Sequence, residues 1–170
     1  GLAGKAEPVP LPDTLAKVTE TLLPLAQERQ ITIHSQLVED VTVSGNASLL
    51  EKAINNNLSN AIRHSPDGAD VFIHLTPSIL TVTNTGASIP EEDLPVLFTP
   101  FYRVEKSRNK STGGSGLGLY LVKTILELHG FRYRVENTET GVVFTVAFRY
   151  NSGNVKIKTV RQVFPYCPKN

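Results

Sequence analysis

The stretch ASLLEKAINNNLSNAIRHSPDG (residues 47–68) has the pattern of an amphipathic helix that ends in a turn. At about 100° per residue, apolar side chains gather on one side of such a helix and polar ones on the other. The apolar side holds Leu50, Ile54, Leu58, Ala61 and Ile62, and the polar side holds Lys52, Asn56, Asn60, Arg63 and His64. We expect a helix from about 47 to 64 with its apolar side in the core.

Asparagine is a mediocre helix former, yet three occur in a row at 55–57 and a fourth stands at 60. Asn56 and Asn60 lie one helical turn apart, so their amide oxygens point toward one place. Such a pair suits a hard cation such as Mg²⁺. A solvated polar face without a function is the simpler alternative for this helix taken alone.

Segments that alternate between apolar and polar residues lie on both sides of this helix and predict β-strands. They cover residues 31–37, 41–43, 71–75, 79–84, 131–136 and 142–148. The last two segments are joined by a short turn near Gly141, which indicates a hairpin. Residues 91–102 predict one or two short helical turns broken at Pro100.

Two further helices complete the expected fold. The first begins at Asp13 as its N-cap and is kinked or split at Pro24. Its buried face holds Leu15, Val18, Leu22 and Leu25. The other helix runs from about 117 to 129 and stops at Gly130. We therefore expect an α+β protein, a two-layer α/β sandwich with helices on one face of a mixed, mainly antiparallel sheet.

The composition indicates one globular domain. The chain has 170 residues, of which 40% are hydrophobic and 19% charged, with a net charge of +1. This balance excludes a disordered tail, a nucleic-acid coat and a polybasic membrane arm. We expect no bound nucleic acid. We also expect no direct membrane contact by this domain, because no apolar run is long enough to span a bilayer. The expected location of the domain is the cytoplasm. The single cysteine, Cys167, excludes an internal disulfide.

Three regions are expected along the chain. Residues 1–12, rich in proline and glycine, predict an extended lead-in, and residues 13–149 hold the domain. Residues 150–170 form an appendage, which is either an edge strand with a tail or foreign to the domain.

A glycine-rich loop, GGSGLGL (113–119), leads into the last predicted helix. Glycines let backbone N–H groups approach a ligand, and a helix N-terminus favours anions. The loop is neither a Walker A motif nor a dinucleotide fingerprint, since it lacks GK[ST] and has Leu119 where the third glycine is needed. Four cations precede it, namely Arg103, Lys106, Arg108 and Lys110. A flexible, solvated loop is the alternative.

Four segments, in this order and spacing, resemble the ATP-binding catalytic domain of sensor histidine kinases, in the gyrase–Hsp90–histidine kinase–MutL superfamily with its Bergerat-type fold. The segments are NNNLSNAIRHS (55–65), VTNTGASIP (82–90), LFTPFYR (97–103) and GGSGLGLYLVKTILELHG (113–130). They are similar to the asparagine box, the first glycine box, the phenylalanine box and the second glycine box. The NTG sequence and FYRVEKSR (101–108) resemble VanS-type sensors.

This resemblance implies ATP and Mg²⁺ as ligands, held between helix 47–64 and a lid over about 99–116. It implies that Asn60 binds Mg²⁺ directly and Asn56 directly or through water, and that Arg103 joins them as a catalytic residue. Arg63 and Arg103 would contact the phosphates, which the amides of Gly114, Gly116 and Gly118 would cradle. Further nucleotide contacts are implied for His64, Asn84, Gly86, Ser88, Ile89, Phe98, Tyr102, Ser115, Leu117, Leu119 and Thr145. For His64, a plain helix-end residue is the alternative.

One departure from the family pattern concerns base recognition. Asn84 stands where the family has an aspartate in DxGxG, and Ser88 replaces the second glycine. A neutral amide oxygen accepts the adenine amino proton more weakly than a carboxylate does, and the amide NH₂ can also donate to adenine N1 or to guanine O6. We expect retained but weaker ATP binding and a partial loss of discrimination against GTP.

A phosphoacceptor histidine in this family is followed by an acid and a nearby TP, which His34, His64, His74 and His129 all lack. The resemblance therefore implies a catalytic domain that binds ATP but cannot phosphorylate itself in isolation. Its expected partners are the dimerisation and phosphoacceptor helices of the same kinase and a cognate response regulator. The resemblance also implies a parent protein that is a membrane sensor.

Two other functions stay open. The first is a degenerate nucleotide-binding or interaction module, in which Asn84 and Ser88 have ended catalysis. The second is an anti-sigma-type serine kinase or a MutL-like ATPase. Hydrolysis is disfavoured, because Asn56 cannot act as the general base that such ATPases need.

Overall fold

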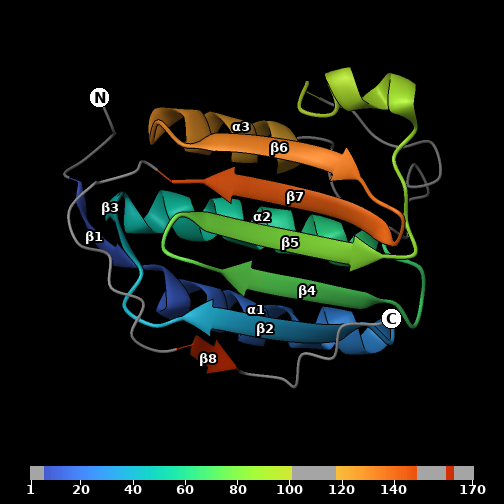
Figure 1. The fold of residues 1–170 in the computed structure, drawn as a ribbon, viewed down its shortest axis with the longest axis horizontal. Coiled ribbons are helices and arrows are strands. Elements are labelled where there is room, and N and C mark those ends of the chain that lie inside the picture. The colour runs from blue at the N-terminus through green and yellow to red at the C-terminus, as the bar shows by residue number, and fades with distance from the viewer. Residues whose placement is uncertain (1–5, 101–117, 149–159, 163–170) are drawn as a thin grey trace.

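The computed structural model describes residues 6–100, 118–148 and 160–162. Its elements are β1 (Glu7–Pro10), α1 (Leu11–Glu28), β2 (Thr32–Val38), β3 (Thr42–Gly45), α2 (Ala47–Arg63), β4 (Asp70–Leu75), β5 (Ile79–Thr85), η1 (Glu91–Val96), α3 (Gly118–Leu128), β6 (Arg132–Asn137), β7 (Gly141–Ala147) and β8 (Val160–Gln162). The α-helices of the described residues cover one face of a six-stranded sheet, as Figure 1 shows. The expected two-layer α+β sandwich is confirmed.

The main sheet is mixed. Its strand order is β6-β7-β5-β4-β2-β8, and the β2–β4 pair is parallel, whereas the other neighbours are antiparallel. A parallel pair needs a crossover between its strands, and here β3 and α2 provide it. Because α2 is this crossover, its C-terminal end leads directly into the start of β4.

The core lies between the sheet and the helices. In β4, Val71, Ile73 and Leu75 point into it and Phe72 and His74 point out, as the period of two requires. All five apolar residues predicted on one side of α2 are buried, while the polar residues predicted opposite them stay at least partly exposed.

Helix α1 differs from the prediction at its start and at Pro24. The helix begins at Leu11 with Pro10 as N-cap, so Asp13 lies inside its first turn instead of capping it. Pro12 lies in this first turn, where proline is tolerated because its missing N–H would have no partner within the helix anyway. The helix also continues through Pro24 to Glu28. Buried residues on both sides of Pro24, Leu22 and Ala26 among them, hold the two parts on the same sheet surface and offset the lost hydrogen bond.

The segment expected as a lead-in belongs to the fold from residue 7 onward. Strand β1 pairs antiparallel with β3 in a separate two-stranded sheet, and Val9 is only 1% exposed. The predicted strand at 41–43 therefore exists but joins β1 instead of the main sheet. Within the expected appendage, β8 pairs antiparallel with the outer edge of β2.

The remaining elements agree closely with the prediction. Strands β6 and β7 form the expected hairpin, and Gly130 follows α3 with a φ of +73°. The short helical turns expected after β5 appear as η1. Of the expected lid, residues 101–116 lie outside the described part of the chain. Among the described residues, no helix is both long and apolar enough to cross a membrane.

Candidate nucleotide-binding site

The end of α2, the end of β5 and η1 lie at one end of the sandwich. Asn84, near the end of β5, pairs with Val71 at the start of β4 and with Val142 at the start of β7. Helix α2 ends seven residues before β4 begins, so its last turn lies at this same end. Figure 1 shows η1 beyond the tips of β5 and β6, again at this end.

Asn56 and Asn60 are placed by the middle and last turns of α2. The helix starts at Asn46, whose side chain accepts a hydrogen bond from the Leu49 N–H at 3.0 Å, and this cap sets the rotation of the residues that follow. Both asparagines are half-buried, and their side-chain amides make no hydrogen bond with another described residue. Two free amide oxygens one turn apart fit a Mg²⁺ ion that keeps water and phosphate as its other ligands.

The last residue of α2, Arg63, is the positively charged side chain expected to contact the phosphates. Arg63 is half-buried and forms no ion pair with another described residue, so its charge is free to meet an anion. His64 is the C-cap residue, and its backbone N–H donates to the Asn60 carbonyl at 3.0 Å. Ser65 closes the helix by donating from its hydroxyl to the Ala61 carbonyl at 2.6 Å.

Gly86 joins the end of β5 to the turn after α2. Its φ of +76° favours glycine, and a Cβ at this position would lie 2.8 Å from Cγ of Pro66. The first glycine box therefore packs directly on the turn that ends the asparagine box. The two motifs that are far apart in the sequence are in contact, as the resemblance implies.

Asn84 lies on the helix side of the sheet and is 6% exposed. Leu80 and Val82, on the same face of β5, belong to the core, and Val71 and Val142 flank Asn84 on the neighbouring strands. Its side-chain amide makes no hydrogen bond with another described residue. Burying an amide costs free energy unless it is hydrogen-bonded, so Asn84 is a candidate to pair with a ligand.

Phe98 is held in an aromatic cluster after η1. Its ring lies edge-on to Tyr133 of β6 and to Phe144 of β7, with centroids 4.9 and 5.8 Å away. The Tyr133 hydroxyl donates to the Glu127 carboxylate of α3 at 2.8 Å. Partial burial, and then the hydrogen bond to Glu127 and its negative charge, raise the pKa of Tyr133 to about 12. Phe98 thus anchors the start of the expected lid to the sheet and, through Tyr133, to α3.

Thr145 is not brought together with the other predicted residues. In β7, Val142, Phe144 and Val146 are buried on the helix side, so alternation places Thr145 on the outer face of the sheet. The residue beside Asn84 on the helix side is Val142. Alternation along β7 indicates the outer face for Thr145, whereas the pairing register decides which residue of β7 stands next to Asn84.

The glycine-rich loop is described only at its end. Gly118 and Leu119 are half-buried in the first turn of α3, and no described atom would lie within 4 Å of a Cβ at Gly118. A helix N-terminus of this kind favours anions. The other predicted residues here lie outside the described residues, namely Tyr102, Arg103, Gly114, Ser115, Gly116 and Leu117.

One site residue was missed by the sequence reasoning. The side chain of Asn137, at the end of β6, forms two hydrogen bonds with the backbone of Ile89. Ile89 is half-buried, and its neighbour Ser88 is exposed. Asn137 precedes the hairpin turn, where asparagine is common for local reasons, so no signal in the sequence distinguished it.

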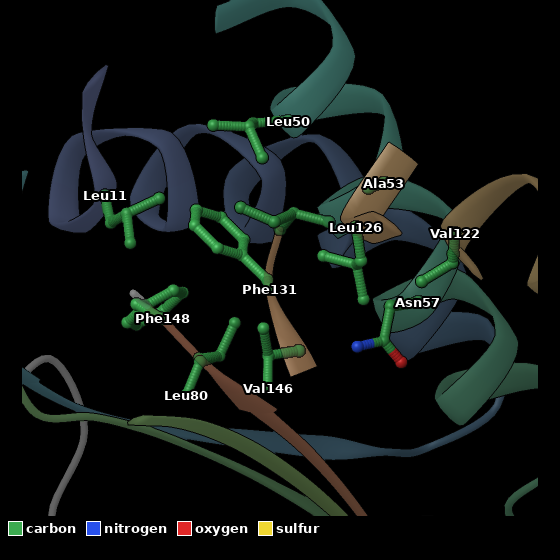
Figure 2. A pocket seen from close by; sticks show the side chains of 11 residues that line it. Leu11, Leu50, Ala53, Asn57, Leu80, Val122, Leu126, Phe131, Val146 and Phe148 are labelled. Carbon is green, nitrogen blue, oxygen red and sulfur yellow. The ribbon is translucent and has the colours of Figure 1, made fainter. Parts of the chain in front are cut away.

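A separate cavity lies deeper between the helices and the sheet, as Figure 2 shows. It measures about 20 Å³, and its lining is apolar except for Asn57, which is 6% exposed. This volume holds a water molecule and not a nucleotide. Its lining residues on α2 begin at Leu50, toward the helix N-terminus, whereas Asn60 and Arg63 lie toward the other end. We therefore take the end of the sandwich that holds Asn60 and Arg63 as the candidate nucleotide site.

Comparison with known proteins agrees with this geometry. A family model described as "Histidine kinase-, DNA gyrase B-, and HSP90-like ATPase" matches residues 45–152, which include α2, β5 and α3. The chain belongs to this family. Membership of the histidine kinase-, DNA gyrase B- and HSP90-like ATPases accounts for the asparagine box on α2 and for the first glycine box at the end of β5.

The similar proteins are sensor kinases. The sensor protein VanSB of Enterococcus faecalis is 33% identical over 143 residues, which are 82% of this chain and 32% of that protein. VanS of Enterococcus faecium is 36% identical over 138 residues, 78% of this chain and 35% of that protein. The chain thus spans about a third of the length of these relatives. The resemblance to VanS-type sensors is confirmed at the level of the family.

Solved structures of this ATPase family have the same fold. The mycobacterial sensor histidine kinase MprB superimposes with a TM-score of 0.73 at 27% identity, covering 84% of this chain and 97% of that one. The catalytic domain of histidine kinase ThkA also gives 0.73, at 25% identity, covering 85% of this chain and 95% of that one. The expected ATP-binding fold is confirmed.

Proposed function

We propose that this chain is the ATP-binding catalytic part of a two-component sensor histidine kinase. It would bind Mg-ATP and transfer the γ-phosphoryl group to a histidine on a separate dimerisation domain. The observation that carries the proposal is the position of three amides in this ATPase fold, those of Asn56 and Asn60 on α2 and of Asn84 on β5. None of them makes a hydrogen bond with another described residue.

In this proposal the phosphate end of the nucleotide lies against the last turns of α2. Asn56 and Asn60 hold Mg²⁺ through their amide oxygens, and Arg63 supplies a positive charge one turn further on. When bound, the cation neutralises charge on the phosphates during transfer. We assign a second phosphate contact to Arg103 and backbone contacts to Gly114, Gly116 and Gly118. The role of the chain is to orient the phosphates and balance their charge.

The base end lies at Asn84. Its amide is buried between Val71 and Val142 of the neighbouring strands. A base that binds here would lose its contacts with water and would contact this amide and the apolar side chains instead. Ile89 and Gly86 follow on the same segment and would form the wall beside the base. Asn84 can accept from the adenine amino group or, with the amide turned, donate to a carbonyl oxygen.

The phosphoacceptor is proposed to lie on other helices of the same kinase, which acts on the cytoplasmic side and passes the phosphoryl group to a response regulator. Two of the chain's own histidines are already engaged. His34 Nε2 lies 2.9 Å from the Asp70 carboxylate. His129 Nε2 accepts from the Asn46 N–H at 3.1 Å, so its Nδ1 carries the proton and donates to the Ile125 carbonyl at 2.7 Å.

Calorimetric titration with ATP and Mg²⁺ tests the site. We expect the chain to bind Mg-ATP and Asn60→Ala to lose at least about tenfold in affinity, because half of the cation site is removed. Asn55→Ala is the matched control, since it removes an asparagine from the same helix outside the proposed site. Equal losses in the two variants would contradict the proposed cation site.

Kinase activity needs a second experiment. The chain is mixed with the dimerisation helices of a related sensor kinase and with γ-labelled ATP. We expect label on the helices when the chain is present and none on the chain alone. ATP binding without any transfer would favour the alternative function, a degenerate nucleotide-binding module, to which the neutral Asn84 points.

A further inference from the structure

The side-chain amide of Asn137 holds the backbone of Ile89 on both sides. Its Nδ2 donates to the Ile89 carbonyl at 2.7 Å, and its Oδ1 accepts from the Ile89 N–H at 2.8 Å. Each bond joins residues 48 positions apart in the chain. An aspartate at this position has no donor for the Ile89 carbonyl, so it can make only one of the two bonds.

We call these two hydrogen bonds between Asn137 and Ile89 the clamp. The clamp acts on an irregular segment between β5 and η1. Residues 86–90 connect β5 to η1 and contain no regular secondary structure. At its beginning, the Gly86 N–H donates to the carbonyl of Thr140 at 2.9 Å, a bond between backbone groups. At its far end, the bonds to Ile89 come from a side chain. The hairpin β6–β7 therefore fixes both ends of the segment, and one of these attachments depends on Asn137.

The position of the segment matters for the proposed function. It starts two residues after Asn84 and leads through η1 to Phe98 and the expected lid. A segment that is already fixed loses less conformational freedom when a ligand binds against it. Gly86, Ser88 and Pro90 are exposed, so the segment contributes little to the core.

From these contacts we propose that Asn137 is a positioning residue of the nucleotide site, which holds Ile89 in place as the wall beside the base. The inference rests on the proposed function. Asn137 does not touch the reacting phosphates and acts through Ile89 alone. Its removal weakens nucleotide binding while the fold remains.

Two variants and a control test this role. Asn137→Ala removes both hydrogen bonds, and Asn137→Ser keeps a hydroxyl that can form one. Thr140→Ala is the control, because Thr140 is exposed on the same turn and holds Gly86 through its backbone carbonyl, which alanine also has. Each protein is titrated with Mg-ATP at a temperature where urea unfolding shows that all are folded.

We expect Asn137→Ala to lose roughly tenfold in ATP affinity, Asn137→Ser to lose less, and Thr140→Ala to match the wild type. Wild-type affinity in folded Asn137→Ala would overturn the proposal. Should Asn137→Ala fail to fold, the affinity of Asn137→Ser decides, and a value equal to that of Thr140→Ala would overturn it.

Hydrogen exchange at the Ile89 amide separates this inference from the proposed function. In the nucleotide-free wild type we expect this amide to be protected, and in Asn137→Ala to exchange at the rate of an open segment. If the wild type binds no nucleotide, the proposed function fails whatever the exchange shows. If the wild type binds ATP but the Ile89 amide exchanges equally in both proteins, the clamp itself is refuted.

Discussion

At the scale of single residues, asparagines have two kinds of role in this chain. Asn56 and Asn60 on α2 and Asn84 on β5 make no side-chain hydrogen bond with another described residue, and we propose them as ligand contacts. Asn137 uses both of its amide groups within the protein, and Asn46 caps α2 with its own. An amide can donate and accept but carries no charge, so its role is set entirely by what the fold places opposite it.

Asn84→Asp tests base recognition. A carboxylate accepts from the adenine amino group more strongly than an amide does and repels the guanine carbonyl. We expect this variant to bind ATP more tightly than the wild type and to raise the ratio of ATP to GTP affinity by roughly tenfold. Competition between the two nucleotides measures the ratio. A wild type that excludes GTP as strictly as Asn84→Asp would contradict the expectation.

Asn57→Leu tests the buried amide in the cavity of Figure 2. Asn57 makes no hydrogen bond with another described residue, and the other lining side chains are apolar. Leucine has a similar size and removes the cost of burying an amide, so we expect the free energy of unfolding to rise by about 1–2 kcal/mol. Urea unfolding measures it. A decrease would show that a bound water satisfies the amide, and Mg-ATP affinity should stay unchanged in either case.

At the scale of elements, the site depends on how α2, β5 and the β6–β7 hairpin are joined. Gly86 packs on Pro66 after α2, and its N–H bonds to the hairpin turn. At Gly141 the hairpin approaches β5 so closely that a Cβ would collide with the carbonyl oxygen of Asn84. These junctions use glycine because backbone meets backbone or side chain without room for a Cβ.

Gly86→Ala and Gly68→Ala form a matched pair. Both glycines have a positive φ, +76° and +83°, so alanine strains the backbone similarly at each. Only at Gly86 would the new Cβ also meet Pro66, because nothing lies within 4 Å of a Cβ at Gly68. We expect each variant to lose about 1 kcal/mol of stability and Gly86→Ala to lose at least about 1 kcal/mol more. Equal losses of stability in urea unfolding would show that Pro66 can move away from the new Cβ without an energetic cost.

The contact between β6 and α3 gives a dependence on pH. The pKa of Tyr133 is raised to about 12 by burial and by Glu127, so folding favours the neutral phenol. This contribution to stability is fully present below pH 10 and is lost as the pH rises from about 10 to 12. Tyr133→Phe removes this contribution to stability, because phenylalanine has no hydroxyl to ionise. We expect the stability difference between wild type and Tyr133→Phe to shrink over this range in denaturant unfolding. A stability difference that stays constant over this pH range would contradict the proposed link between ionisation of Tyr133 and unfolding.

At the scale of the whole molecule, nucleotide and metal should act on the stability of the entire fold. The proposed site involves α2, β5 and the start of α3, and residues of all three elements belong to one hydrophobic core. A ligand that binds only the folded state therefore stabilises all of them together.

Metal removal tests this linkage. Mg-ATP at about 100 times its Kd should raise the free energy of unfolding by about 2.7 kcal/mol. We expect EDTA to abolish most of this gain, because ATP without Mg²⁺ leaves the charges of its phosphates unbalanced beside Asn56 and Asn60. The midpoint of thermal unfolding measures both effects. A gain that EDTA does not reduce would show that the nucleotide binds without the proposed cation.

The sequence by itself determined the elements and the family. The period of α2, the alternation in β4, β5, β6 and β7, and the order of the glycine- and asparagine-rich motifs are local patterns, and local patterns are readable because each residue's neighbours in the chain are known. The apolar side of α2 and the hairpin could both be predicted in this way.

Only the tertiary structure decided the features that depend on distant partners. Strand β1 forms from a proline-rich segment because β3, over thirty residues further on, pairs with it, and α1 passes Pro24 because the core holds it on both sides. The register of β5 with β7 puts Val142, not Thr145, beside Asn84. Asn137 meets Ile89 across 48 positions of the chain. Such contacts arise from packing and register, which no short stretch of sequence contains.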